Sequence, residues 1–202
     1  ALIAALIISL SPIFFYLSFH HYTEIPSTFF TLLSLLLVRN KRYFLAGIMV
    51  SLAFLAKFPA GLFFAAILLT LLYARKWRDA VLLTLGFATL VFPYLFWSRI
   101  AYGGLFETLS VASISIRQAL GCNVLRAQPW YQYVYWLVFS ETKLHFFALV
   151  GIAGLFFNKK RSVLFIGSLL LPLLYFSHLH CRDYRYLALF LPFVAMLTAY
   201  GI

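Results

Sequence analysis

The sequence predicts an all-α fold, a bundle of membrane-spanning helices, and three observations carry this prediction. First, 64% of the 202 residues are hydrophobic and only 10% are charged, with a mean hydropathy of +0.97. Such a chain lacks the polar surface that a water-soluble domain needs. Second, the apolar residues form runs that are separated by short polar breaks. Third, the tight basic clusters occupy alternate breaks, as expected of cytoplasmic loops.

Eight apolar runs are candidate helices, and the number of spans is therefore about eight. In chain order the runs are Ala1–Phe19, Ile25–Val38, Tyr43–Ala56, Phe58–Tyr73, Ala80–Ser98, Leu144–Phe157, Val163–Ser177 and Tyr184–Ile202. Several are shorter than the roughly 20 residues of a perpendicular span, so some helices are expected to be broken or to recruit polar ends. We find no internal repeat and no linker, which favours a single integral membrane domain over residues 1–202.

Three prolines, Pro93, Pro172 and Pro192, lie inside apolar runs. Each removes a backbone donor and is expected to kink its helix, and kinked helices often surround a cavity. The alternative is that they only shape packing, since membrane helices tolerate proline.

The basic residues distinguish the two sides of the predicted bundle. The chain has 16 basic and 5 acidic residues and a net charge of +11, which in a soluble protein would suggest nucleic acid as a partner. Here nine basic residues cluster in three short breaks, which favours a topological role and no nucleic-acid partner. These are Arg39, Lys41, Arg42, Arg75, Lys76, Arg78, Lys159, Lys160 and Arg161.

The other breaks are predicted to face away from the cytoplasm, and they hold most of the chemistry-bearing side chains. Four of the five carboxylates and every histidine fall there: Glu24, Glu107, Glu141, Asp183, His20, His21, His145, His178 and His180. We therefore expect a protein of the plasma membrane with its active face extracytoplasmic. Cys122 and Cys181 fall on the same side, so a disulfide between them is possible, although the sequence does not fix the pairing.

One long connection, about residues 99–143, is predicted to lie on the outer side. It includes Glu107, the amphipathic stretch LSVASISIRQAL and the aromatic block PWYQYVYW. Aromatic rings of this kind often lie at the membrane interface. Two interpretations stay open for the block: an interfacial anchor, or a surface on which a lipid chain or a sugar stacks.

The first candidate site segment is SFHHYTEIPSTFF, residues 18–30. His20, His21 and Tyr22 precede Glu24 at the mouth between two predicted helices. These side chains suit hydrogen bonding to a sugar or proton transfer. The alternative is purely local: Thr23 can cap the helix, and Glu24 favours the positive end of its dipole.

The second segment is LAFLAKFPAGLF, residues 52–63, where Lys57 stands alone between two apolar runs. An ammonium group there is unfavourable unless it reaches the interface or meets an anion, and a phosphate is the obvious anion.

The third segment, HLHCRDYRYLALFLPF, spans residues 178–193 and contains Arg182, Asp183, Arg185 and Tyr186. Arginine forks match phosphate oxygens. The pattern H-x-H-C lacks the paired spacing of a zinc site, so we expect no metal and no cofactor.

These three segments, in this order, resemble the polyprenyl-phosphate-sugar-dependent glycosyltransferases of the GT-C fold, the superfamily of protein O-mannosyltransferases and lipid A aminoarabinose transferases. The family's Ser-Pro run, short outer loop and acidic helix start are echoed by LSPIFFYLSFHHYTEIPSTFF. Its Thr-Lys-Gly-Pro motif is matched by LAKFPAG, with Ala56 for Thr and Phe58 for Gly. Its final Arg-Tyr corresponds to Arg185-Tyr186, ahead of Pro192.

The resemblance implies a membrane enzyme that moves a sugar, such as a mannose-like hexose, from a polyprenyl or dolichyl phosphate to a protein, lipid or glycan acceptor. Glu24 would support catalysis, with Glu107 as the next candidate, and Lys57 would face the lipid phosphate beside Arg185-Tyr186. The family's usual catalytic acid precedes anything in this chain. Because Ala1 opens inside an apolar run, we expect a fragment. The resemblance implies that this fragment begins at about the third membrane helix and is inactive alone.

Two other classes of protein fit the same composition. A transporter or lipid flippase would show corresponding broken helices in two halves, and the sequence shows no such symmetry. A non-catalytic scaffold subunit would tolerate loss of Glu24, Lys57 and Arg185.

Overall fold

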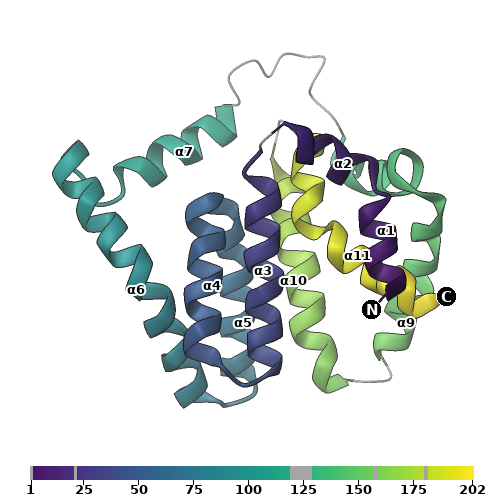
Figure 1. Cartoon of the computed structure of the whole chain (residues 1–202), viewed down its shortest axis with the longest axis horizontal. Coiled ribbons are helices and arrows are strands. Elements are labelled where there is room, and N and C mark those ends of the chain that lie inside the picture. The colour runs from purple at the N-terminus through teal and green to yellow at the C-terminus, as the bar shows by residue number, and fades with distance from the viewer. Residues whose placement is uncertain (1, 21, 119–128, 157–158, 180–181) are drawn as a thin grey trace.

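A computed structural model of the chain describes residues 2–20, 22–118, 129–156, 159–179 and 182–202. Within these residues all regular structure is helical, which confirms the all-α prediction. Figure 1 shows the long helices side by side, with shorter helices across one end. In chain order these are α1 (Leu2–Ser9), α2 (Pro12–Phe19), α3 (Glu24–Arg39), α4 (Tyr43–Ala56), α5 (Gly61–Tyr73), α6 (Trp77–Tyr102), α7 (Glu107–Gln118), α8 (Gln132–Tyr135), α9 (Phe147–Phe156), α10 (Lys159–His178) and α11 (Leu187–Gly201).

Short irregular helices join several of these elements. Residues Phe58–Ala60 form the 3-10 turn η1, Lys143–Phe146 form η4 and Tyr184–Tyr186 form η5, while Trp136–Glu141 form the π-helical segment η3. The region 99–143 therefore includes helical segments, because α6 extends to Tyr102 and α7, α8 and η3 follow.

The first predicted run, Ala1–Phe19, is not one straight helix. It divides into α1 and α2, whose axes differ by 60°. Ser11 causes the break: its hydroxyl oxygen accepts from the Phe14 backbone N–H at 3.4 Å and caps α2, and Pro12 then takes the first helical position. A serine followed by proline is a strong helix start, and here it outweighs the apolar character of the run.

The number of membrane spans stays a prediction. Among the described residues one helix, α6, is long and apolar enough to cross a bilayer, and the bent pair α1–α2 qualifies if its two helices act as one span. Shorter apolar stretches of 10 to 17 residues are Tyr43–Ala56, Phe58–Tyr73, Lys143–Ala153 and Val163–His178. Such helices need tilting, local thinning or polar ends to span hydrocarbon.

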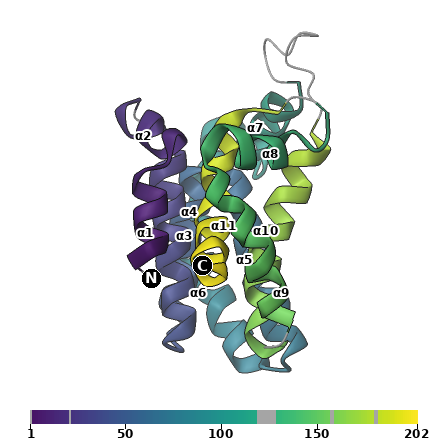
Figure 2. The same cartoon turned by 90° about the vertical axis from the view of Figure 1, so that its right-hand side faces the viewer.

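The core of the bundle is built around α11. Consecutive residues from Leu187 to Ala195 are buried, and Figure 2 shows α11 enclosed between α1 and α3 on one side and α9 and α10 on the other. A helix that is apolar all round needs neighbours on every face. Glycines bring some of these neighbours close, since a Cβ at Gly151 would collide with the backbone of Leu197 and one at Gly201 with that of Phe147.

Small residues also bring α4 and α6 together. A Cβ at Gly47 would collide with the Leu83 carbonyl, and one at Gly86 with the Phe44 carbonyl. Such close backbone approach is typical of helix pairs in membranes.

The two ends of the bundle differ in charge. The α3–α4 turn, the α5–α6 turn and the start of α10 lie together at the lower end in Figure 1. The three basic clusters therefore share one end. The breaks that hold Tyr22, Lys57 and Arg185 lie at the opposite end, beside α2.

Candidate functional site

The break between α2 and α3 supplies the first part of the candidate site. Glu24 is the first residue of α3 and is fully buried. Thr23 makes no side-chain cap, so the expected capping role for Thr23 is wrong. Tyr16, His20 and Tyr22 form an aromatic group, with the Tyr16 and His20 rings stacked at 4.3 Å and the His20 and Tyr22 rings at 6.0 Å.

The His20 ring has a defined orientation. Its Nδ1 lies 2.8 Å from the carbonyl oxygen of Tyr16. Because a carbonyl only accepts, Nδ1 must carry a proton, and in the neutral imidazole Nε2 is then the acceptor. The exposed His20 can thus offer an acceptor toward the outside of the bundle.

Lys57 lies in the break between α4 and η1, where the backbone is extended. Its ammonium group forms an ion pair with Glu24 Oε1 and lies 4.8 Å from the ring centroid of Tyr186. The Lys57 side chain keeps 16% of its surface exposed, while that of Glu24 has none. One acid, one ammonium group and one aromatic face from three distant segments therefore meet here.

Glu24 has an unused acceptor in this arrangement. Its Oε2 is buried and has no hydrogen-bond partner among the described residues. A buried carboxylate oxygen without a partner is unfavourable, and such an atom in a native site commonly awaits a ligand, an ion or a water molecule.

The turn that precedes α11 provides the second ion pair. Arg185 donates from Nε and Nη2 to Asp183 Oδ2 at 2.8 and 2.5 Å, and its backbone N–H donates to Oδ1 at 3.0 Å. The Arg185 guanidinium also lies 4.9 Å from the ring centroid of Tyr22, so this turn joins the aromatic group at the start of α3.

Asp183 is ionised in this setting. Burial alone would raise the pKa of Asp183, but the hydrogen bonds and charge of Arg185 outweigh it and hold the pKa below its usual value. A backbone contact adds to the pair, because the buried Tyr133 hydroxyl donates to the Asp183 carbonyl at 3.2 Å.

The structure thus brings together Glu24, Lys57 and Tyr186 and, beside them, Tyr22, Asp183 and Arg185. We call these six residues the outer cluster. Arg182 lies in the same turn and donates from Nη2 to the carbonyl of Ser177 near the end of α10, at 2.5 Å. The roles assigned to these residues from the sequence stay predictions.

Not every predicted site residue joins the outer cluster. Glu107 begins α7 and is exposed. Within the described part of the chain, no hydrogen bond or ion pair links Glu107 to the outer cluster, and Figure 1 shows α7 beginning beside the end of α6, on the far side of the bundle from α2. His21 lies outside the described residues, as do Cys122, His180 and Cys181. Among the residues that the structure describes, no three His, Cys, Asp or Glu side chains converge as a metal site would require.

Sequence reasoning missed the part played by Glu141. Ser11 donates to Glu141 Oε2 at 2.5 Å, and the hydroxyl of Tyr184 donates to Oε1. Burial, and the hydrogen bond to Glu141, raise the pKa of Tyr184 and keep its phenol protonated as a donor. Glu141 therefore ties the α1–α2 break to the turn that carries Asp183 and Arg185. The Ser-Pro pair marked the break, but no local pattern marked a partner 130 residues away.

The comparisons with known proteins agree with the first two segments. The family model described as dolichyl-phosphate-mannose-protein mannosyltransferase matches residues 1–97, a range that contains Glu24 and Lys57. Neither a curated protein nor a solved structure gives a significant match. The resemblance inferred from the sequence is thereby confirmed over residues 1–97, slightly less than half of the chain, which are similar to this glycosyltransferase family.

Proposed function

We propose that the outer cluster binds the phosphate of a polyprenyl-phosphate-linked or dolichyl-phosphate-linked sugar and supports transfer of that sugar to an acceptor. The family description names a dolichyl-phosphate-mannose donor and a protein acceptor, which supports a mannose-like hexose as the group transferred. Lipid and glycan acceptors fit the same chemistry. The active face is extracytoplasmic in this proposal, because the outer cluster lies opposite the three basic clusters.

The observation that carries the proposal is the buried Glu24–Lys57 pair with one unused carboxylate oxygen. A lysine ammonium group has three donors, and Glu24 uses one of them here. A phosphate oxygen can accept from the others while Tyr186 covers one side of the cation. Glu24 Oε2 is then available to accept a hydrogen bond from a sugar hydroxyl.

Arg185 adds a second phosphate donor. Asp183 takes the N–H groups of Nε and Nη2, so Nη1 still has hydrogens to offer. Asp183 also fixes the guanidinium plane, which reduces the entropy lost when an anion binds. An anion held between Lys57 and Arg185 would leave its lipid chain free to extend into hydrocarbon.

The transfer step conserves atoms and charge as follows. The acceptor oxygen forms a bond to C1 of the sugar, and the bond between C1 and the phosphate oxygen breaks. The lipid phosphate leaves with the bonding electron pair. The proton of the acceptor hydroxyl passes to a carboxylate within hydrogen-bond reach of the acceptor oxygen, which acts as the general base. Lys57 and Arg185 stabilise the charge that develops on the leaving phosphate. Glu24 has the supporting role of orienting the sugar.

The test compares Lys57→Ala with Lys57→Arg in sugar transfer from a lipid-phosphate donor, measured in membranes that contain the complete protein rather than residues 1–202 alone. We expect a loss of about 100-fold or more in kcat/KM for Lys57→Ala and a partial recovery for Lys57→Arg. Lys41→Ala, in the α3–α4 turn at the opposite end, is the matched control and should retain transfer.

A second variant separates phosphate binding from stability. Lys57→Ala combined with Glu24→Gln leaves no unpaired buried charge, and it should still lack transfer. Normal turnover in Lys57→Ala would overturn the proposal. Retained turnover in the double variant would also contradict a phosphate role for Lys57, and it would favour a scaffold role for the outer cluster.

A further inference from the structure

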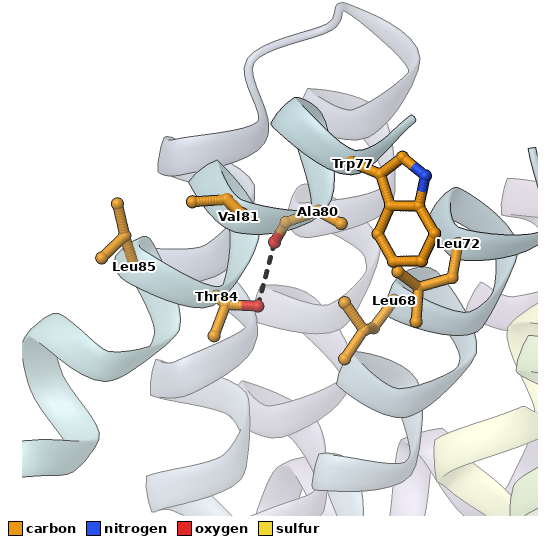
Figure 3. A pocket seen from close by; sticks show the side chains of 7 residues that line it. All are labelled: Leu68, Leu72, Trp77, Ala80, Val81, Thr84 and Leu85. Atoms are coloured by element: carbon orange, nitrogen blue, oxygen red, sulfur yellow. Dashed lines mark hydrogen bonds between the residues drawn. The ribbon is translucent and has the colours of Figure 1, made fainter. Parts of the chain in front are cut away.

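A shallow apolar hollow lies between α5 and α6, near the end of the bundle that carries the basic clusters (Figure 3). Its lining residues are Leu68, Leu72, Trp77, Ala80, Val81, Thr84 and Leu85. Thr84 already donates its hydroxyl proton to the Ala80 carbonyl at 2.9 Å, as the dashed line in Figure 3 shows. The surface of the hollow is thus almost entirely hydrocarbon, and it suits an alkyl chain rather than a polar ligand.

Basic residues flank Trp77, which lines this hollow, and we call these basic residues its rim. Arg75 and Lys76 form the turn that precedes α6, and Arg78 lies in its first turn, all three with exposed side chains. Trp77 stands between them with 65% of its surface exposed, as interfacial indoles do. One carboxylate, the partly buried Asp79, lies in the same first turn of α6, so the three basic side chains outnumber it.

We propose that this hollow and its rim bind one anionic phospholipid. An acyl chain packs against Leu68, Leu72 and Leu85, and the lipid phosphate meets Arg75, Lys76 and Arg78. Charge complementarity selects this occupant, because a basic rim beside an apolar floor matches the two parts of such a lipid. The inference depends on the membrane placement of α6 and is independent of the chemistry of the outer cluster.

The backbone conformation at Arg75 allows its charge to be removed by a substitution that keeps the turn intact. Arg75 adopts a left-handed conformation with φ of 56° and closes the α5 C-terminus, since the N–H groups of Arg75 and Lys76 donate to Leu72 and Leu71. Lys41 occupies the same position after α3, with φ of 59°. Glycine accepts this conformation more readily than any other residue. Arg75→Gly therefore removes a rim charge without disturbing the turn, and Lys41→Gly makes the same change away from the hollow.

The test is native mass spectrometry of the purified protein mixed with equal amounts of dioleoylphosphatidylglycerol and dioleoylphosphatidylcholine. We expect preferential retention of the phosphatidylglycerol. Arg75→Gly should lower its occupancy about fivefold, the factor that one basic side chain contributes near an anionic group. Lys41→Gly should stay within about twofold of the parent protein.

A second variant tests the apolar part of the site. Thr84→Trp fills the hollow and should displace the phosphatidylglycerol even though the basic rim is intact. Equal retention of the two lipids would overturn the proposal, as would an equal loss in Arg75→Gly and Lys41→Gly. Sugar transfer is not the readout, so these outcomes are distinguishable from failure of the proposed function.

Discussion

The two ends of the bundle hold their cations in opposite ways. At the end that holds the outer cluster, Lys57 and Arg185 each contact a carboxylate and an aromatic ring, and both are at least partly buried. At the basic end Lys41 and Arg75 lie in exposed turns. A paired and partly buried cation contributes to a specific site, whereas an exposed cation mainly orients the neighbouring helices. Mutations at equivalent charges should therefore have unequal effects.

The largest difference is expected between Lys57 and Lys41. Lys57→Met leaves the buried Glu24 without its partner and should lower the free energy of unfolding by about 3–5 kcal/mol. Lys41→Met should change it by less than about 0.5 kcal/mol. Thermal unfolding in detergent micelles measures both. Combining Lys57→Met with Glu24→Gln should recover part of the lost free energy of unfolding. Equal losses of stability in Lys57→Met and Lys41→Met would show that the two ends of the bundle do not hold their cations differently.

The next effect concerns the two carboxylates Glu141 and Glu107, both of which were predicted to face outward. Glu141→Ala removes the acceptor for Ser11 and Tyr184 and should cost about 2–3 kcal/mol, while Glu141→Gln should cost less. Glu107→Ala affects only an exposed helix start and should cost at most about 1 kcal/mol. The same unfolding assay applies. A loss at Glu107 as large as that at Glu141 would show that α7 is held more firmly than its exposure indicates.

A smaller effect is expected from the pH dependence of Asp183. Its pKa is lowered in the folded protein, so its contribution to stability is present above the unfolded-state pKa of about 3.9 and is lost as the pH falls through the folded-state value. Asp183→Asn should lower stability near neutral pH by about 1 kcal/mol. The difference in stability between the two proteins should shrink progressively as the pH falls below about 4. An unchanged gap at pH 3 would argue against an ionised Asp183–Arg185 pair.

The smallest effect is expected at the basic end itself. Replacing Arg75 or Lys41 by glycine relieves a left-handed conformation, but glycine also increases the entropy of the unfolded chain. The net change should be a gain of at most about 1 kcal/mol in each case. Thermal unfolding of the two variants checks this, and a clear loss in either one would show that the side chain makes contacts beyond its turn.

The sequence predicted the helical class and the grouping of the basic clusters at one end of the bundle, because both follow from composition and from the alternation of polar breaks. It placed Glu24, Lys57 and Arg185 at the same end for that reason. It did not predict that Glu24 pairs directly with Lys57 or that Arg185 lies against Tyr22, since these contacts depend on how α3, η1 and η5 pack.

Two further features were not predicted from the sequence, for related reasons. The break at Ser11 was hidden by the apolar residues around it, although the Ser-Pro pair was a usable signal. Glu141 was recognised as an outer carboxylate, but its hydrogen bonds join segments that are far apart along the chain. The described residues of the predicted connection 99–143 include the helices α7 and α8 and the π-helical segment η3, which the sequence did not place.

The enclosure of α11 has a consequence for biogenesis. The ribosome makes α11 after α1, α3, α9 and α10, yet α11 fills the space between them. The faces of the earlier helices that pack on α11 therefore stay uncovered until α11 follows. Packing of this bundle can finish only after α11 is synthesised, so the chain folds last at the segment that fills its centre.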